Sequence, residues 1–303
     1  MLRRYVTVDV FTAQIFGGNP LAVVLDAQGL TTAQMQAIAT EFNYAETTFV
    51  LPPRNPQHTA HVRIFTARIE VPFAGHPNVG TAVVLAHDLV AKGGPPVDRM
   101  VFEEAAGLVP IHLLRESGAV VGAEFTAPKQ LSLGASISAE EAAECLSILP
   151  SEIRTEIHGP QVLSVGLAFL VAEVTTREVL RRCKPSMSAH ERVLPSNGTD
   201  SIYAYVRGAA EGELHARMFA PIDATAEDPA TGSAAAATIA LLALRRPERD
   251  AEVAWRIEQG VDMGRPSLLL GRTVKRDGKL ASVHVAGNAV QVMHGFLSVP
   301  AGS

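Results

Sequence analysis

Alternating apolar and polar side chains along much of the chain predict a protein rich in β-strands. Residues 5–11 (YVTVDVF) alternate and lead into the turn FGGNP at 16–20. Such alternation is typical of a strand that buries one face. Comparable runs predict strands at 21–25, 47–53, 61–66, 98–116, 119–126, 161–166, 168–174, 201–207, 214–220, 252–258, 267–275, 280–286 and 288–297.

A capping box predicts the first helix. Thr31 is followed three residues later by Gln34, a spacing that satisfies two free N–H groups at a helix start. The helix is expected to run to about Phe42, and Glu46 then lies between this helix and the next strand. Other helices are predicted at 139–147, after the capping pair Ser138 and Glu141, at 176–183, and within the looser segment 184–200.

Two stretches of the chain repeat each other, AGHPNVGTAVVLA at 74–86 and AEDPATGSAAAATIALL at 226–242. Aligned without a gap from His76 and Asp228, both read X-Pro-x-x-Gly-(Thr/Ser)-Ala and continue into small and apolar residues. We expect each motif at a helix N-terminus, where free N–H groups and the helix dipole favour an anionic ligand. The two copies are therefore predicted to be halves of one site. The corresponding helices are expected at about 77–90 and 229–244.

The two long helices are apolar on most of their faces, so each must be enclosed by other elements. Together with the high strand content, this predicts an α+β fold in which a curved, largely antiparallel sheet surrounds a buried helix. The architecture is expected twice, with a cleft between the halves. Strand order does not follow from the sequence.

Composition and charge exclude several function classes. The chain has 303 residues, 47% of them hydrophobic and 19% charged, which is enough for two domains. A net charge of -5 gives no basic surface for nucleic acid or an acidic membrane, and no run approaches the roughly 20 apolar residues of a membrane span. The only cysteines, Cys145 and Cys183, have no metal-ligand spacing. We expect a cytoplasmic protein with neither nucleic-acid nor membrane partners.

Segments along nearly the whole chain resemble the phenazine biosynthesis PhzF-like isomerase/epimerase family, in the family's order. They are VDVFTAQIFGGNPLAVV at 8–24, AETTF at 45–49, IFTARIEVPFAGHPNVGTA at 64–82, EDPATGSA at 227–234, QGVDMGRPS at 259–267 and VAGNAV at 285–290. The resemblance implies a diaminopimelate-epimerase-like fold with two pseudo-symmetric halves, a cofactor-free site and a homodimer. Because the last strand of such folds commonly returns to the first half, the halves are expected at 1–118 with 288–303 and at 119–287, with the active-site cleft between them.

The resemblance also assigns candidate site residues. The family's catalytic glutamate is matched by Glu46, and its other site residues by Gly75, His76, Asp228, Gly232 and Ser233. In the enzyme that gives the family its name, trans-2,3-dihydro-3-hydroxyanthranilate is isomerised by moving a proton between carbon atoms. The expected function is a similar proton transfer on a small carboxylate substrate.

General chemistry agrees with this assignment. A carboxylate in an apolar cleft has a raised pKa, so Glu46 could take a proton from carbon and return it. His76 and Asp228 are expected to relay the proton or to bind the substrate's amine and hydroxyl. The N–H groups around Gly75, Gly232 and Ser233 are expected to hold its carboxylate. No metal and no cofactor is expected.

Other interpretations remain open from the sequence. Glu46 could be a solvated loop residue, Asp228 only a helix cap, and His76 only a core hydrogen-bonding residue. Two-base racemases of this fold use cysteines in the stretches that correspond to 74–80 and 226–232, which contain none here. A thiol-based racemase is therefore disfavoured. A carboxylate-based epimerase of an amino or hydroxy acid and a non-catalytic small-molecule binding protein remain possible.

Overall fold

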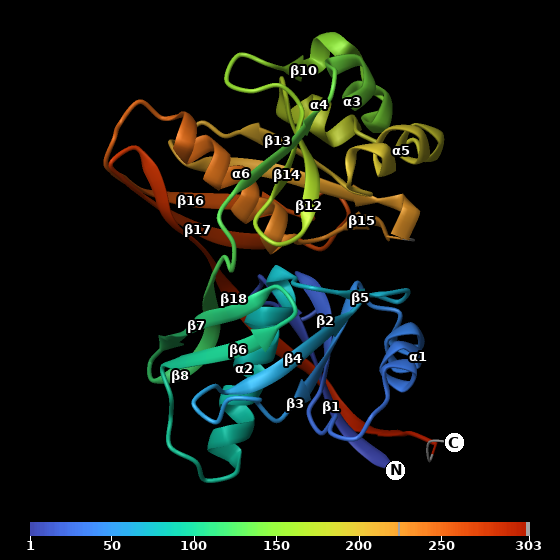
Figure 1. Ribbon diagram of the computed structural model, residues 1–303, viewed down its shortest axis with the longest axis vertical. Helices are drawn as coiled ribbons and strands as arrows, with labels where there is room; N and C mark the ends of the chain where they lie inside the picture. Colours follow the sequence, from blue (N-terminus) through green and yellow to red (C-terminus); the bar gives the residue numbers. More distant parts are fainter. Residues whose placement is uncertain (224, 301–303) are drawn as a thin grey trace. The chain divides into compact units, whose positions relative to one another are not determined.

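The computed structural model of the chain describes residues 1–223 and 225–300, in two compact units (Figure 1). The first unit comprises Met1–Pro128 and the C-terminal residues from Ala286 onward, and the second comprises Lys129–Val285. No helix among the described residues is both long and apolar enough to cross a membrane.

The first boundary between the units differs from the expected one. We expected residues 119–126 in the second half, but this strand, β8 (Ala119–Thr126), lies in the first unit. It pairs antiparallel with β7 (Gly107–Glu116) and so continues the sheet of the first unit. The C-terminal strand does rejoin the first unit, from Ala286 rather than residue 288.

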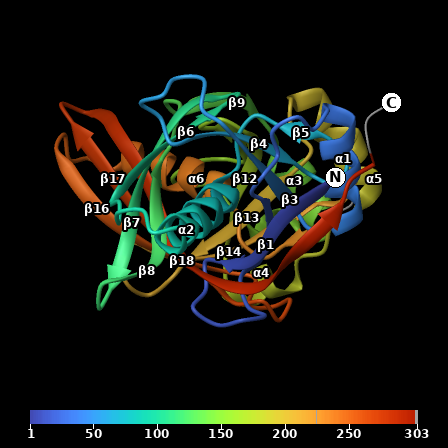
Figure 2. The same ribbon diagram turned by 90° about the horizontal axis from the view of Figure 1, so that it is seen from below.

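The strands of the first unit close on themselves around a helix. In addition to β7 and β8 they are β1 (Leu2–Val10), β2 (Asn19–Val24), β3 (Glu46–Leu51), β4 (Ala60–Phe65), β5 (Glu70–Val71), β6 (Arg99–Glu104) and the C-terminal part of β18 (Lys279–Ser298). Pairing runs from β1 through β2, β3, β4, β6, β7 and β8 to β18, which pairs with β1 again. The enclosed helix is α2 (Gly75–Ala91), around which these strands are seen in Figure 2.

The apolar character of α2 explains its position. Every residue from Gly75 to Val84 is buried, so this part of the helix has no face turned to water. The other helix of this unit, α1 (Thr32–Phe42), begins at the predicted capping box. It packs outside the sheet in an apolar cluster that contains Met35 and Phe49. It ends at Asn43 in the left-handed conformation, which turns the chain into β3 at Glu46.

The second unit has a comparable plan around α6 (Gly232–Arg245), which is buried through Ala243. Its strands are β9 (Ser132–Ser136), β10 (Ile153–Arg154), β11 (Gln161–Ser164), β12 (Ala168–Val174), β13 (Ile202–Arg207), β14 (Glu213–Ala220), β15 (Thr225–Asp228), β16 (Ala251–Gln259) and β17 (Ser267–Arg276). Its outer helices are α3 (Ala139–Leu146), α4 (Arg177–Arg182) and α5 (Met187–Val193), and its 3-10 turns are η1 (Pro150–Glu152), η2 (Pro195–Asn197) and η3 (Pro221–Asp223).

The pairing of the strands confirms the expected pseudo-symmetry. The order β2, β3, β4, β6, β7 in the first unit corresponds to β12, β13, β14, β16, β17 in the second. In both series the contacts are parallel, antiparallel, parallel and antiparallel. The short strands β5 and β15 pair antiparallel with β4 and β14 and each leads into the central helix. The architecture is therefore a duplication.

Several element boundaries were wrong. The helix expected from residue 229 begins at Gly232. Asp228 is still paired with Met218 in the sheet, and the backbone N–H of Thr231 donates a hydrogen bond to the side chain of Gln259. The strands expected at 280–286 and 288–297 are one strand, β18. The two-residue strands β5 and β10 were missed because they are too short for an alternating pattern.

Candidate active site

In the first unit, three polar residues from three elements meet at the start of α2. Glu46 is the first residue of β3, Asn19 is the first residue of β2, and His76 is the second residue of α2. The Nε2 atom of His76 lies 3.3 Å from Oε2 of Glu46, and its Nδ1 lies 3.2 Å from the amide Nδ2 of Asn19. The contact with Glu46 is less well directed than an ordinary hydrogen bond, as contacts of acid/base groups often are without substrate.

Burial sets the protonation of this cluster. The side chain of His76 is 3% exposed and that of Glu46 is 17% exposed. Desolvation lowers the pKa of His76 to about 3, because an imidazolium is costly in a site that water does not reach. His76 is therefore neutral near pH 7. A solvated loop position for Glu46 does not fit its small exposed fraction.

In the second unit, Asp228 belongs to a polar cluster with Thr231 and Gln259. The hydroxyl of Thr231 donates to the carboxylate of Asp228. The amide of Gln259 donates to the carbonyl of Asp228 at 2.8 Å and to the Thr231 hydroxyl at 3.0 Å. Asp228 is only 5% exposed, so these contacts fix its orientation. Since Asp228 ends β15, it is not the N-terminal cap that the sequence suggested.

The start of α6 supplies the remaining predicted residues. Gly232 and Ser233 are its first two residues, and both are buried. Gly75 and His76 are likewise the first two residues of α2. The structure therefore matches His76 with Ser233, and the ungapped match of His76 with Asp228 was wrong.

A stronger repeat, missed in the sequence, gives the correct register. Residues 61–65 (HVRIF) match 215–219 (HARMF), and 70–75 (EVPFAG) match 227–232 (EDPATG). The spacing between the two parts differs by three residues, so a gap is needed to see it. The pattern is His-x-Arg-x-Phe in β4 and β14, followed by Glu-x-Pro-x-x-Gly at the helix start.

The repeated residues make the same contacts in both units. Arg63 donates to both oxygens of Glu70, at 2.7 and 2.6 Å, and Arg217 to both oxygens of Glu227, at 2.8 and 2.7 Å. Each arginine also lies over the phenylalanine two residues later. We call each set an Arg–Glu clamp. It ties the short strand before the central helix to its neighbour and so fixes where the helix begins.

The register also shows how the two units differ. Thr48 and Tyr203 occupy matched places, because they pair with Ile64 and Met218 of the repeated motif. Two residues earlier along the chain, Glu46 is matched by Ser201, which directly precedes β13. The first unit thus has a carboxylate and an imidazole where the second has two serines.

The two cysteines do not occupy these positions. Cys145 is in α3 and Cys183 follows α4, and both are buried in an apolar cluster. Burial raises the pKa of the Cys145 thiol to about 11 and that of Cys183 to about 12. Neither thiol is suited to form the thiolate that a cysteine-based racemase needs.

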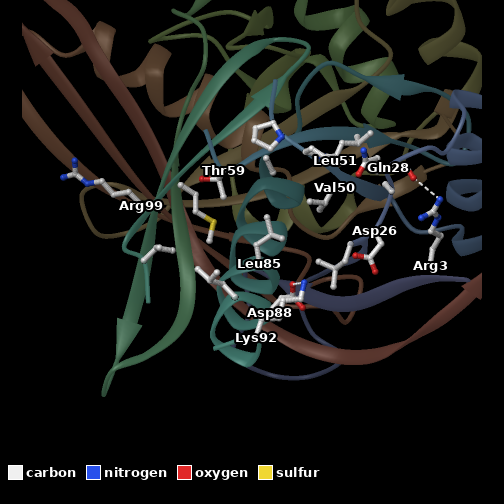
Figure 3. Close-up of a pocket in the computed structure, with 18 residues that line it drawn as sticks. Arg3, Asp26, Gln28, Val50, Leu51, Thr59, Leu85, Asp88, Lys92 and Arg99 are labelled. Atoms are coloured by element: carbon white, nitrogen blue, oxygen red, sulfur yellow. Dashed lines mark hydrogen bonds and ion pairs between the residues drawn. The ribbon is translucent and has the colours of Figure 1, made fainter. Parts of the chain in front are cut away.

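A large cavity in the first unit lies at the other end of α2. It has a volume of about 620 Å³ and is lined by Leu85 and Asp88 of the helix and by Lys92, the residue that follows the helix, among other residues (Figure 3). Asp88 is paired with Arg4 and Lys92. The C-terminal end of a helix dipole disfavours anions, so this cavity is a poor place for a carboxylate substrate. In residues 1–223 and 225–300, no group of three or more His, Cys, Asp or Glu is placed to hold a metal ion.

Comparisons with known proteins identify the family of the chain. The model of the family described as phenazine biosynthesis-like protein matches residues 8–295. An uncharacterised isomerase from Mesorhizobium japonicum is 42% identical, over 98% of this chain and 99% of that protein. A trans-2,3-dihydro-3-hydroxyanthranilate isomerase from Pseudomonas chlororaphis is 35% identical, again over 98% of this chain and 99% of the relative.

Solved structures give the same result. A PhzF-family protein from Bacillus anthracis has a TM-score of 0.83 at 26% identity, covering 99% of this chain and 100% of that one. A hydroxyproline epimerase from Agrobacterium vitis shares the fold alone, with a TM-score of 0.66 at 13% identity over 98% of this chain and 91% of that one. The protein is an isomerase with the α+β fold of the diaminopimelate-epimerase-like class. It belongs to the PhzC-PhzF family of phenazine biosynthesis-like proteins.

Proposed function

We propose that the protein is a cofactor-independent isomerase that moves a proton between carbon atoms of a small carboxylate substrate, with Glu46 as general acid/base. The observation that carries the proposal is the largely buried Glu46 carboxylate, 3.3 Å from the neutral ring of His76 at the start of a buried helix. A base in such a place is poorly solvated, which favours proton abstraction from carbon.

The difference between the units supports a single base. A two-base epimerase needs an acid on one face of the carbon and a base on the other. At the places in the second unit that match Glu46 and His76 stand Ser201 and Ser233, which are poor proton acceptors at neutral pH. One carboxylate that takes a proton and returns it to a second carbon fits this asymmetry.

The relatives and the helix starts support a proposal for the substrate class. The Pseudomonas chlororaphis relative is named for trans-2,3-dihydro-3-hydroxyanthranilate, an amino acid with a hydroxyl group, and we propose this compound or a close analogue as substrate. The N–H groups at Gly75, Gly232 and Ser233 would hold its carboxylate, and Asp228 its amine. The same proposal has three further parts. Both helix starts serve one site, and His76 and Asp228 take part in catalysis. The protein is a cytoplasmic homodimer.

Proton exchange in deuterated water tests the proposal. Wild-type protein should isomerise or deuterate one compound of a panel that contains trans-2,3-dihydro-3-hydroxyanthranilate and small amino and hydroxy acids, followed by NMR. Glu46→Gln should lower the rate by about 1,000-fold, because the amide cannot accept the proton. Glu41→Gln, on an exposed position of α1, is the control and should retain the wild-type rate. An equal rate in Glu46→Gln would show that Glu46 is not the base.

A carboxylate-based epimerase is the second candidate, because Asp228 is another buried carboxylate. An epimerase should incorporate deuterium with inversion at a single carbon. This activity should be lost in Glu46→Gln and also in Asp228→Asn. Isomerisation with a shifted double bond would exclude it. If thermal shifts report ligands and no compound exchanges its proton, the protein acts as a binding protein for those ligands.

A further inference from the structure

The orientation of the His76 ring is set by a residue that the family resemblance did not single out. Asn19 is completely buried, and its amide is 3.2 Å from Nδ1 of His76. Asn19 opens β2, where it pairs with Val10. The chain reaches it through Gly18, which has φ +59° and whose Cβ, if present, would lie 2.2 Å from the carbonyl of Val10. The backbone therefore holds Asn19 at one position beside the ring.

The neighbours of the ring decide which nitrogen carries its proton. A carboxylate can only accept hydrogen bonds, so the 3.3 Å contact with Glu46 is favourable when Nε2 of His76 is protonated. A neutral ring has one proton, so Nδ1 then has a lone pair and must accept. The amide NH₂ of Asn19 is the donor at that place. In the opposite tautomer, the lone pair of His76 Nε2 would face a lone pair of the Glu46 carboxylate, which is unfavourable.

We infer that Asn19 is a positioning residue that holds His76 as the Nε2–H tautomer, so that the ring turns an N–H group toward Glu46 and does not act as a proton relay. For its catalytic consequence this inference rests on the proposed function. The ring is nearly inaccessible, so no substrate proton reaches Nδ1, which is already occupied by Asn19. The role of His76 is to orient the Glu46 carboxylate and to stabilise its charged form.

The tautomer can be measured without any substrate. Protein with ¹⁵N-labelled histidine, compared with His76→Gln to assign the signals, should show His76 with a proton on Nε2 and none on Nδ1 from pH 6 to 8. A proton on Nδ1 in the wild-type protein, or a mixture of the two forms, would overturn the inference. This measurement does not depend on finding the substrate.

Asn19→Asp separates positioning from a merely structural role. Aspartate has the same shape as asparagine but only accepts, so it should draw a proton to Nδ1 and leave a charged imidazolium beside Glu46. We expect kcat to fall about 100-fold with little change in KM, and Asn19→Ala to be less impaired than Asn19→Asp. A purely structural role predicts the reverse order, which would overturn the inference. The control is Asn78→Ala, which removes a buried amide of α2 that donates to the carbonyl of Ala74 and does not contact His76, and it should leave the tautomer unchanged.

The two proposals fail in different ways. If His76 has the Nε2–H tautomer and no compound is turned over, the proposed function is wrong and the tautomer assignment stands. If turnover depends on Glu46 and His76 has its proton on Nδ1, the function stands and the role of Asn19 is wrong.

Discussion

At the scale of single residues, the same side chain behaves in opposite ways at adjacent positions of β6. Glu103 accepts backbone N–H groups of Asn55 and Arg54, at 2.8 Å each, and these contacts together with His58 lower its pKa to about 2. The carboxyl of Glu104 is buried, and desolvation raises its pKa well above the ordinary value. Glu103 therefore ionises at a lower pH than an ordinary glutamate, and Glu104 ionises at a higher pH.

This contrast predicts opposite effects of Glu→Gln. The folded form of Glu104 keeps its proton to a higher pH than the unfolded form, which loses it above about pH 4.5, so this residue costs stability increasingly as the pH rises through that value. Glu104→Gln should therefore have little effect at pH 4 and raise the melting temperature at pH 7.

Glu103 supplies the matched comparison. Its lowered pKa contributes stability that is present above about pH 4.5 and lost as the pH falls toward 2. Glu103→Gln should lower the melting temperature at pH 7 and have a smaller effect at pH 3. Thermal melts of the two variants between pH 3 and 8 test both signs, and parallel curves for the two would contradict the assignment.

At the scale of elements, the Arg–Glu clamps relate the motif to the position of the central helices. The two clamps differ in burial: the side chains of Arg217 and Glu227 are 10% and 14% exposed, those of Arg63 and Glu70 are 20% and 34% exposed. Arg217 also donates to three carbonyls at the end of α4, at distances from 2.9 to 3.1 Å.

Removing one acid from each clamp should show this difference. Glu227→Gln leaves a buried guanidinium without its charge partner and should cost about 3 kcal/mol of unfolding free energy. Glu70→Gln leaves a more solvated arginine and should cost about 1 kcal/mol. Urea unfolding measures both. Equal losses would mean that the deeper burial of the Arg217–Glu227 clamp does not determine how much it contributes to the free energy of unfolding.

At the scale of the whole molecule, the first unit depends on residues from both ends of the chain. The sheet closes where β8 meets β18, and Gly122 lies so near this seam that a Cβ would be 2.3 Å from the carbonyl oxygen of Gly287. The backbone at Gly287 cannot move aside without breaking the pairing of β8 with β18, which closes the sheet around α2.

Gly122→Ala should therefore destabilise the protein by about 2 kcal/mol through overpacking. Gly159 is the control, because a Cβ there meets nothing within 4 Å and its φ is not positive. Gly159→Ala should leave the urea midpoint unchanged. A Gly122→Ala variant as stable as wild type would show that the seam is able to open.

Local patterns determined much of this protein. Alternation gave most long strands, the capping box of Thr31 gave α1 with its true start, and two apolar helices implied a duplicated architecture. The family motifs also pointed to Glu46 and His76, which the fold brings within 3.3 Å of each other. These features follow from residues close in sequence, so they are visible without a structure.

Tertiary structure alone decided the rest. The start of α6 depends on Gln259, 28 residues away from Thr231, and the placing of β8 depends on pairing with a strand from the other end of the chain. Asn19 and His76 are 57 residues apart, and nothing in the local sequence of either shows that they touch. Periodicity reports which face of an element is buried, and only the packed fold reports which buried groups share a hydrogen bond.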